Sequence, residues 1–172
     1  ELGERVQDIL ITGAAYVVTD VGAAHHALVA RESLEAVGIS VQVFEMPSGE
    51  VSKSLEMVRR IYSWLTLHRA ERGDLVIALG GGVVGDIAGF VAATFLRGMR
   101  FVQVPTTLLA MVDSSIGGKT GVDLPEGKNL VGSFHQPQFV LDDVKTLQTL
   151  SERQRISGWA EAIKHGLIAD EG

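Results

Sequence analysis

The sequence predicts an α/β fold in which an open, Rossmann-like parallel sheet carries helices on both faces. Short apolar runs alternate with amphipathic stretches through residues 15–104, which is the order expected of strand–helix–strand units. Residues 75–79 are apolar at every position, as in a strand buried on both faces. Three consecutive glycines then join this run to a helical pattern, as at the ligand-binding edge of many such sheets.

The elements of this sheet are expected in a regular order. Gly38 is typical of a residue that ends a helix, and the hydroxyl of Ser52 is expected to cap the helix that follows it. The expected strands cover residues 15–18, 39–44, 75–79 and 101–104, and the helices between them cover 22–37, 52–65 and 84–96.

After Pro105 the pattern changes. Residues 113–135 are rich in Gly, Ser, Lys and Asp, which predicts loops or short hairpins. Residues 139–141 are expected to add a last strand, and residues 151–169 to form a helix with an apolar stripe. We therefore expect one domain at residues 1–150 and the start of a second at 151–172.

Composition excludes several classes of protein. Of 172 residues, 46% are hydrophobic, which excludes a disordered chain, and the absence of cysteine excludes disulfides and thiolate metal sites. The net charge of −6, without a basic stripe, predicts no nucleic-acid partner. No apolar run reaches membrane-spanning length and no signal peptide is visible, so we expect no membrane association. Because the chain starts at Glu1 and stops just after a helical pattern, we expect a fragment or processed chain.

The glycine turn after the third expected strand is a candidate phosphate site. Gly80, Gly82 and Gly85 fit the pattern G-x-G-x-x-G at the start of a helix, whose free N–H groups suit a pyrophosphate. The turn follows the third strand rather than the first, so it is not a standard dinucleotide fingerprint. A tight turn with close packing explains the same residues, and both interpretations stay open.

Polar residues follow the fourth expected strand. Thr106 and Thr107 should lie beside the glycine turn, where they either contact a ligand or cap the next helix. Lys119 and Lys128, in a loop rich in glycine and hydroxyl groups, would bind a carboxylate or phosphate; alternatively they are solvated surface lysines.

The last expected helix carries a second candidate site. Glu161 and Lys164 share one face, either as a surface ion pair or as a metal ligand beside a substrate-binding ammonium. His165 is expected to point elsewhere around the helix. The other histidines of the expected helices should lie on the surface: His25, His26 and His68.

From Gly80 onward the sequence resembles the 3-dehydroquinate synthase family of the sugar phosphate cyclases. The resemblance covers about half of the chain in correctly spaced motifs, and it extends more loosely to residues 18–20 and 47–53. The motifs are GGGVVGD at 80–86, RG at 97–98, PTTLLA at 105–110, DSSIGGKT at 113–120, GKNL at 127–130 and AEAIKHG at 160–166.

The resemblance implies a lyase that depends on NAD and a divalent metal, zinc or cobalt. Its substrate would be the sugar acid phosphate 3-deoxy-D-arabino-heptulosonate 7-phosphate, converted to 3-dehydroquinate and phosphate in the shikimate pathway. It also implies a cytoplasmic homodimer and a chain about twice as long, with an all-α C-terminal domain that supplies two histidine metal ligands.

The resemblance also implies roles for individual residues. Glu161 would bind the metal, and Arg97 would reach the substrate phosphate across the dimer interface. The other residues implied in catalysis or substrate binding are Asp113, Lys119, Lys128, Asn129 and Lys164. The residues implied in NAD binding are Asp20, Gly49, Glu50, Lys53, Gly81, Gly82, Val83, Val84, Gly85, Asp86, Thr106, Thr107, Lys119, Lys128, Thr146 and Thr149.

Three alternatives remain open. A related cyclase would act on another heptulose phosphate, but it would have no substrate carboxylate for Lys119. A non-catalytic module would bind NAD without turnover. A metal-dependent alcohol dehydrogenase of similar fold would accumulate NADH, whereas the synthase returns its hydride in each cycle.

Overall fold

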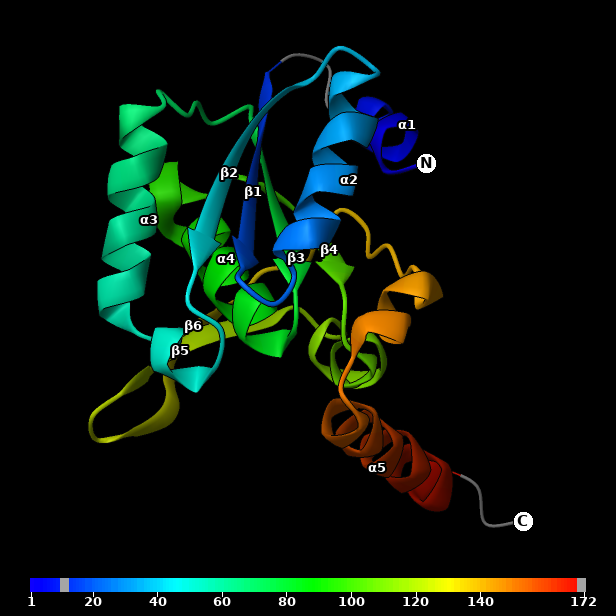
Figure 1. The fold of residues 1–172 in the computed structure, drawn as a ribbon. Helices are drawn as coiled ribbons and strands as arrows, with labels where there is room; N and C mark the ends of the chain where they lie inside the picture. Colours follow the sequence, from blue (N-terminus) through cyan, green and yellow to red (C-terminus); the bar gives the residue numbers. More distant parts are fainter. Residues whose placement is uncertain (10–12, 170–172) are drawn as a thin grey trace.

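The computed structural model describes residues 1–9 and 13–169, and its centre is a four-stranded parallel sheet (Figure 1). The strand order is β2-β1-β3-β4, with every neighbouring pair parallel. This arrangement confirms the predicted α/β fold. The strands are β1 (Ala14–Asp20), β2 (Ser40–Met46), β3 (Leu75–Gly80) and β4 (Arg100–Pro105).

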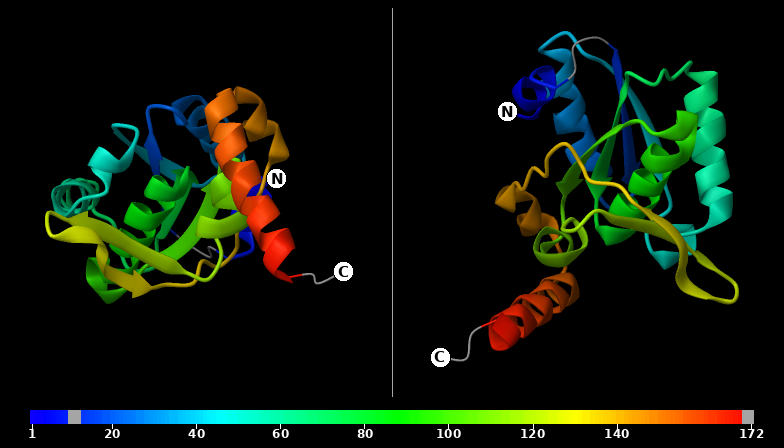
Figure 2. Two further views of the ribbon diagram at one scale, coloured as in Figure 1. Left: turned by 90° about the horizontal axis from the view of Figure 1, so that it is seen from below. Right: turned by 180° about the vertical axis from the view of Figure 1, so that it is seen from behind.

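Helices cover both faces of the sheet because alternate strand residues point to opposite sides. Tyr16 and Val18 of β1 pack into one buried cluster, with α3 and α4. Ala15 and Val17 pack into the other, with α1 and α2 (Figure 2). The helices are α1 (Leu2–Gln7), α2 (Ala24–Glu35), α3 (Leu55–Leu67) and α4 (Gly82–Thr94).

The prediction that Ser52 caps the helix expected at residues 52–65 was wrong. Ser52 lies in a short 3-10 helix, η1 (Glu50–Ser52), and donates a 2.6 Å hydrogen bond to the carbonyl of Pro47. Ser54 instead caps α3, where its hydroxyl accepts from the N–H of Met57. Both serines precede the same apolar pattern, and the extra 3-10 turn moves the helix start by two residues.

We expect Ser54→Ala to lower the free energy of unfolding by about 1 kcal/mol, because the first turn of α3 loses its only side-chain acceptor among the described residues. Urea unfolding of the variant measures the change. Ser63→Ala is the matched control on the same helix, because its exposed hydroxyl bonds within the described structure only to the carbonyl of Arg59. Equal losses in both variants would contradict the capping role.

The second half of the chain adds a hairpin and a projecting helix. Strands β5 (Lys119–Leu124) and β6 (Gly127–Phe134) pair antiparallel and pack against α4, which confirms the predicted hairpin. Residues 139–141 form only a single bridge, between Val140 and Gln103, rather than the expected strand. The remaining elements are η2 (Phe95–Arg97), the π-helix η3 (Ala110–Ser114), η4 (Val144–Thr149) and α5 (Glu152–Ala169).

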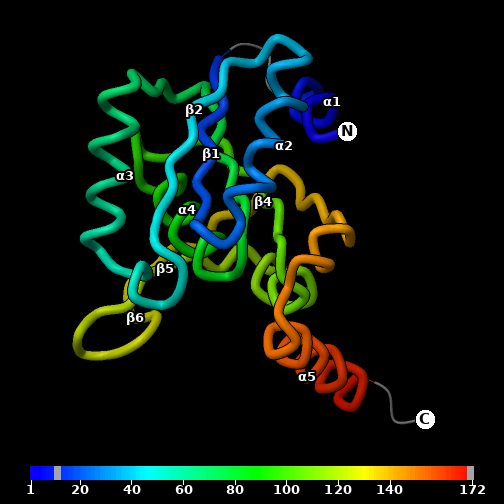
Figure 3. Tube along the Cα trace, in the orientation of Figure 1, coloured from blue at the N-terminus to red at the C-terminus, as the bar shows by residue number. Residues whose placement is uncertain are grey.

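Helix α5 confirms the helix expected at 151–169 and extends away from the sheet (Figure 3). Its apolar stripe is exposed at Ile156, Trp159, Ile163 and Leu167. Residues 170–172, the end of the expected second domain, lie outside the described residues, and the domain boundary stays a prediction. In the described part of the chain, no helix is long and apolar enough to cross a membrane.

Candidate functional site

Two adjoining cavities lie at the carboxyl edge of the parallel sheet. The glycine-turn cavity, of about 490 Å³, is bordered by the ends of β1 and β3 and the start of α5. The hairpin cavity, of about 470 Å³, lies between α4, η3 and the β5–β6 hairpin. They adjoin where Gly82 of the first meets Ser114 of the second: a Cβ on Gly82 would lie 2.8 Å from Ser114 Oγ.

The glycine-turn cavity collects half of the residues that the resemblance implies in NAD binding. The sheet register pairs Gly80 with Pro105, so the residues after these two strands lie side by side. Asp20 ends β1, and its carboxylate accepts a hydrogen bond from the N–H of Ala23. The implied residues that line this cavity are Asp20, Gly49, Gly81, Gly82, Val83, Thr106, Thr107 and Thr149.

The first turn of α4 is open to this cavity. Its N-cap residue is Gly81, and no described side chain bonds to the N–H groups of that turn. The backbone at Gly81 is also closely packed, because a Cβ on this residue would lie 3.3 Å from the methyl group of Thr107. Thr107 both caps the following turn, by accepting from the N–H of Ala110, and lines the cavity. Close packing and an open cavity thus occur together at the glycine turn, and helix capping and cavity lining occur together at Thr107. These pairs of interpretations do not exclude each other.

His26 is a cavity residue that the sequence analysis placed on the surface. It is half-buried, and its Nε2 lies 3.2 Å from the hydroxyl of Thr149. Because that hydroxyl donates to the carbonyl of Thr146, it is left to accept from His26. Burial lowers the pKa of His26, and the neighbouring His25 lowers it further. The sequence feature that could have indicated this burial is the position of His26 beside Ala27, within the buried stripe of α2.

His68 is also half-buried rather than on the surface, with Nδ1 2.9 Å from the carbonyl of Trp64. His25 is exposed, as expected.

The hairpin cavity is lined by charged and amide side chains from four separate elements. Asp86 comes from α4, Asp113 from η3, Lys119 from β5 and Asn129 from β6. Two carboxylates, an ammonium and an amide around one cavity supply both acceptors and donors for a ligand that carries hydroxyl groups and negative charge.

Three other implied residues form ion pairs beside this cavity. Lys53 is buried and pairs with Asp86, at 2.5 Å from its Oδ2. Burial raises the pKa of Asp86, and the Lys53 hydrogen bond opposes that rise. Glu50 and Lys128 form an exposed pair at 2.7 Å, and the hydrogen bond that Lys128 donates to Glu50 raises the pKa of Lys128.

Several implied residues lie outside the lining of either cavity, among them Arg97 and Thr146. Arg97 is exposed at the far end of α4, in a strained corner where it has φ 64° and Leu96 has φ 50°. Thr146 is buried in η4, and its hydroxyl donates to the carbonyl of Asp143.

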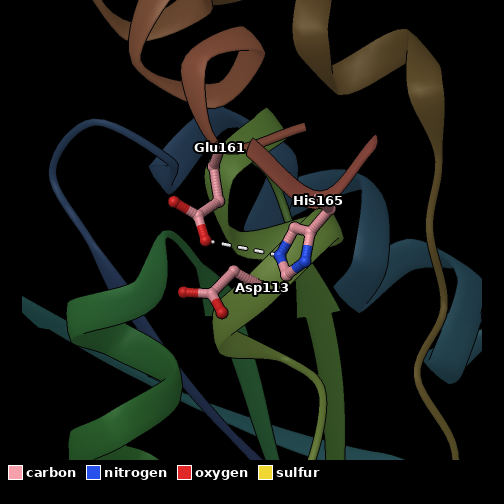
Figure 4. Close-up of side chains that lie close together, drawn as sticks. All are labelled: Asp113, Glu161 and His165. Carbon is pink, nitrogen blue, oxygen red and sulfur yellow. Dashed lines mark ion pairs between the residues drawn. The ribbon is translucent and has the colours of Figure 1, made fainter. Parts of the chain in front are cut away.

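Three metal-type ligands meet between η3 and α5. Side chains of Asp113, Glu161 and His165 point toward one another, and one donor atom from each lies within 4.8 Å of the others (Figure 4). His165 Nε2 lies 3.3 Å from Glu161 Oε1. Lys164 pairs with the same oxygen, and its hydrogen bond lowers the pKa of Glu161. Carboxylate oxygen and imidazole nitrogen are ligands that zinc accepts.

The expectation that His165 points away from Glu161 was therefore wrong. Four residues of helix turn through about 400°, so His165 lies only about 40° around the axis from Glu161. Lys164, three residues from Glu161, lies on its other side. The expected ion pair and the expected metal ligand thus share one carboxylate.

Comparison with known proteins agrees with this geometry. The chain is 56% identical to a 3-dehydroquinate synthase of Symbiobacterium thermophilum over 161 residues, covering 93% of this chain and 45% of that protein. A 2-deoxy-scyllo-inosose synthase, solved with carbaglucose-6-phosphate, NAD⁺ and Co²⁺, superposes with TM-score 0.88 at 30% identity, over 95% of this chain and 45% of that one. A 2-epi-5-epi-valiolone synthase from Streptomyces hygroscopicus, with NAD⁺ and Zn²⁺ bound, gives TM-score 0.84 at 31% identity, over 92% and 44%.

The chain spans about half the length of these relatives. Residues 43–157, which include the glycine turn and the start of α5, match the family described as the N-terminal domain of 3-dehydroquinate synthase. The chain belongs to the 3-dehydroquinate synthase family.

Proposed function

We propose that the full-length protein is a 3-dehydroquinate synthase. It would release phosphate from 3-deoxy-D-arabino-heptulosonate 7-phosphate and form 3-dehydroquinate, with NAD and a divalent metal as cofactors. The observation that carries this proposal is the meeting of the two cavities at Gly82 and Ser114, with Asp113 shared between the hairpin cavity and the metal-type cluster. Such a reaction needs a cofactor, a substrate and a metal in direct contact.

The glycine-turn cavity fits NAD. The uncapped first turn of α4 offers N–H groups and a partial positive charge to a pyrophosphate. Asp20, at the end of β1, offers a carboxylate oxygen to a ribose hydroxyl. When bound, NAD would accept a hydride from a ring carbon and later return it. Glu50, Lys53, Thr146 and the other implied residues outside this cavity remain predictions.

The cluster of Asp113, Glu161 and His165 fits a divalent metal, zinc or cobalt, by the chemistry of its donors. We propose Glu161 as a ligand, with Asp113 and His165 within reach of the same ion. A bound metal would polarise a substrate oxygen and so make the neighbouring C–H more acidic. Lys164 must leave Glu161 Oε1 for a metal to bind there, which frees its ammonium for the substrate.

The substrate would bind in the hairpin cavity. Lys119 would pair with its carboxylate, while Asp113 and Asn129 would hold ring hydroxyls. Lys128 would lie between cofactor and substrate, and Arg97 would reach the substrate phosphate across the interface of a homodimer. As the resemblance implies, we place this homodimer in the cytoplasm.

Cofactor balance separates this proposal from the dehydrogenase alternative. With NAD, zinc and the heptulosonate phosphate, the full-length protein should form 3-dehydroquinate without net accumulation of NADH, because the hydride returns to the substrate. Absorbance of NADH, followed together with product formation, measures this. Stoichiometric NADH would support an alcohol dehydrogenase instead.

A further inference from the structure

Lys53 is a buried lysine whose ammonium joins two residues of the hairpin cavity. The residue is 7% exposed. Its Nζ lies 2.5 Å from Asp86 Oδ2 and donates a 2.6 Å hydrogen bond to Asn129 Oδ1. Asp86 belongs to α4 and Asn129 to β6, and both line the cavity. Since an unpaired buried ammonium is costly, these two contacts explain why a lysine is stable at this position.

The backbone of Lys53 is held as firmly as its ammonium. Its carbonyl accepts a 2.9 Å hydrogen bond from the N–H of Asp123 in β5, and its own N–H donates to the carbonyl of Glu50. Ser54, the next residue, forms a parallel bridge with Asp123. The side chain is therefore anchored at its base to β5 and at its tip to α4 and β6.

Asn129 needs such support because its backbone is strained. Its φ is 56°, in the left-handed region, and its N–H donates to Asp123 Oδ1 at 2.8 Å. An ammonium has only donors, so Lys53 selects the amide oxygen of Asn129 and leaves the amide NH₂ for another partner. In the same way it takes one carboxylate oxygen of Asp86 and leaves the other.

We propose that Lys53 is a positioning residue: its ammonium holds Asp86 and Asn129 so that the hairpin cavity presents a carboxylate oxygen and an amide NH₂ to the hydroxyl groups of a sugar acid phosphate. Lys53 itself makes no contact with the ligand. This role rests on the proposed function, and it differs from the direct NAD contacts that the resemblance implies for Lys53 and Asp86.

The charges around Asp86 make this role measurable. Lys53 is the cation that contacts it, Glu50 and Asp123 are the acidic groups that act on it, and Asp113 and Lys119 line the same cavity. Lys53→Met keeps most of the side-chain volume but removes the ammonium. The half-buried Asp86 would then lie among acidic groups without its cation, so its pKa would rise further above its unfolded value.

The pH dependence of Tm tests the positioning role of Lys53 without any substrate. A carboxyl whose pKa is higher in the folded state loses stability as the pH rises from its unfolded to its folded pKa. In the full-length protein, Lys53→Met should therefore lower Tm more at about pH 8 than at about pH 5. Adding Asp86→Asn should remove this difference, and Lys53→Arg should keep the wild-type behaviour. Equal losses of Tm at both pH values would overturn the proposal.

Arg59→Met is the control for this experiment. It breaks an exposed ion pair with Glu56 on α3 and should change Tm by similar amounts at about pH 8 and about pH 5, because Glu56 is ionised at both pH values.

Catalysis gives the second readout. Lys53→Met should lower kcat/KM for phosphate release by about 30-fold or more, and Asn129→Ala by a similar factor. Because Lys53 acts through Asn129, the combined loss should be at least about tenfold smaller than the product of the two single losses. A combined loss equal to that product would mean that Lys53 acts independently. If the wild-type protein releases no phosphate, the proposed function fails, and the Tm experiment still decides the role of Lys53.

Discussion

Lys119→Ala should lower phosphate release by the full-length protein by about a hundred- to a thousandfold, while the affinity for NAD stays within about twofold. Lys119 begins β5 and lines the hairpin cavity with Asp113 and Asn129. Removing its ammonium would leave the substrate carboxylate without its cation. The glycine-turn cavity has no lining contribution from Lys119, so the cofactor should bind nearly as before.

Steady-state phosphate release and fluorescence titration with NAD measure the two quantities. Lys145→Ala is the matched control, because Lys145 is an exposed lysine of η4 outside the lining of both cavities. Turnover unchanged by Lys119→Ala would remove Lys119 from the substrate site. A large loss of NAD affinity would instead place Lys119 on the cofactor, which the resemblance also implies.

Glu161→Ala should abolish stoichiometric zinc binding by the full-length protein. Glu161 supplies the carboxylate on which His165, Lys164 and the proposed metal converge. Losing one direct ligand of a zinc site lowers affinity by orders of magnitude, more than the roughly 10–100-fold expected for an indirect contact. Metal analysis after dialysis gives the zinc content directly, and a normal content would contradict the assignment.

The same measurement separates the ligands of this cluster. If His165 binds the metal, His165→Ala should lower the zinc content, whereas His25→Ala, at an exposed histidine of α2, should not. If only Glu161→Ala has an effect, the remaining ligands come from the rest of the full-length protein. Lys164→Met should strengthen metal binding, because it removes the cation that competes for Glu161 Oε1.

Much of the fold was predictable from local pattern. The run at 75–79 became the fully buried strand β3, because both faces of a central parallel strand are covered. The glycine turn was predictable because it lies between a strand and a helix in the sequence itself. The three-residue spacing on one helix also predicted that Glu161 and Lys164 lie side by side. The four-residue spacing from Glu161 would have placed His165 beside it in the same way.

Contacts between distant segments could not be predicted in this way. Lys53 and Asn129 are separated by 76 positions, and they meet only because β5 pairs with the backbone beside α3. His26 likewise meets Thr149 across 123 positions, a contact between α2 and η4 that local spacing does not predict. The choice between Ser52 and Ser54 as cap depended on one extra 3-10 turn, whose hydrogen bonds have no periodic signal in the sequence.

Phosphate release from two substrates tests the central claim most directly. The full-length protein, supplied with NAD and zinc, would be assayed with 3-deoxy-D-arabino-heptulosonate 7-phosphate and with sedoheptulose 7-phosphate. We expect release only from the first, because Lys119, which lines the hairpin cavity, is proposed to pair with a carboxylate that the second lacks. Release only from sedoheptulose 7-phosphate would contradict the account, because the protein would then be a different sugar phosphate cyclase and Lys119 would have another role.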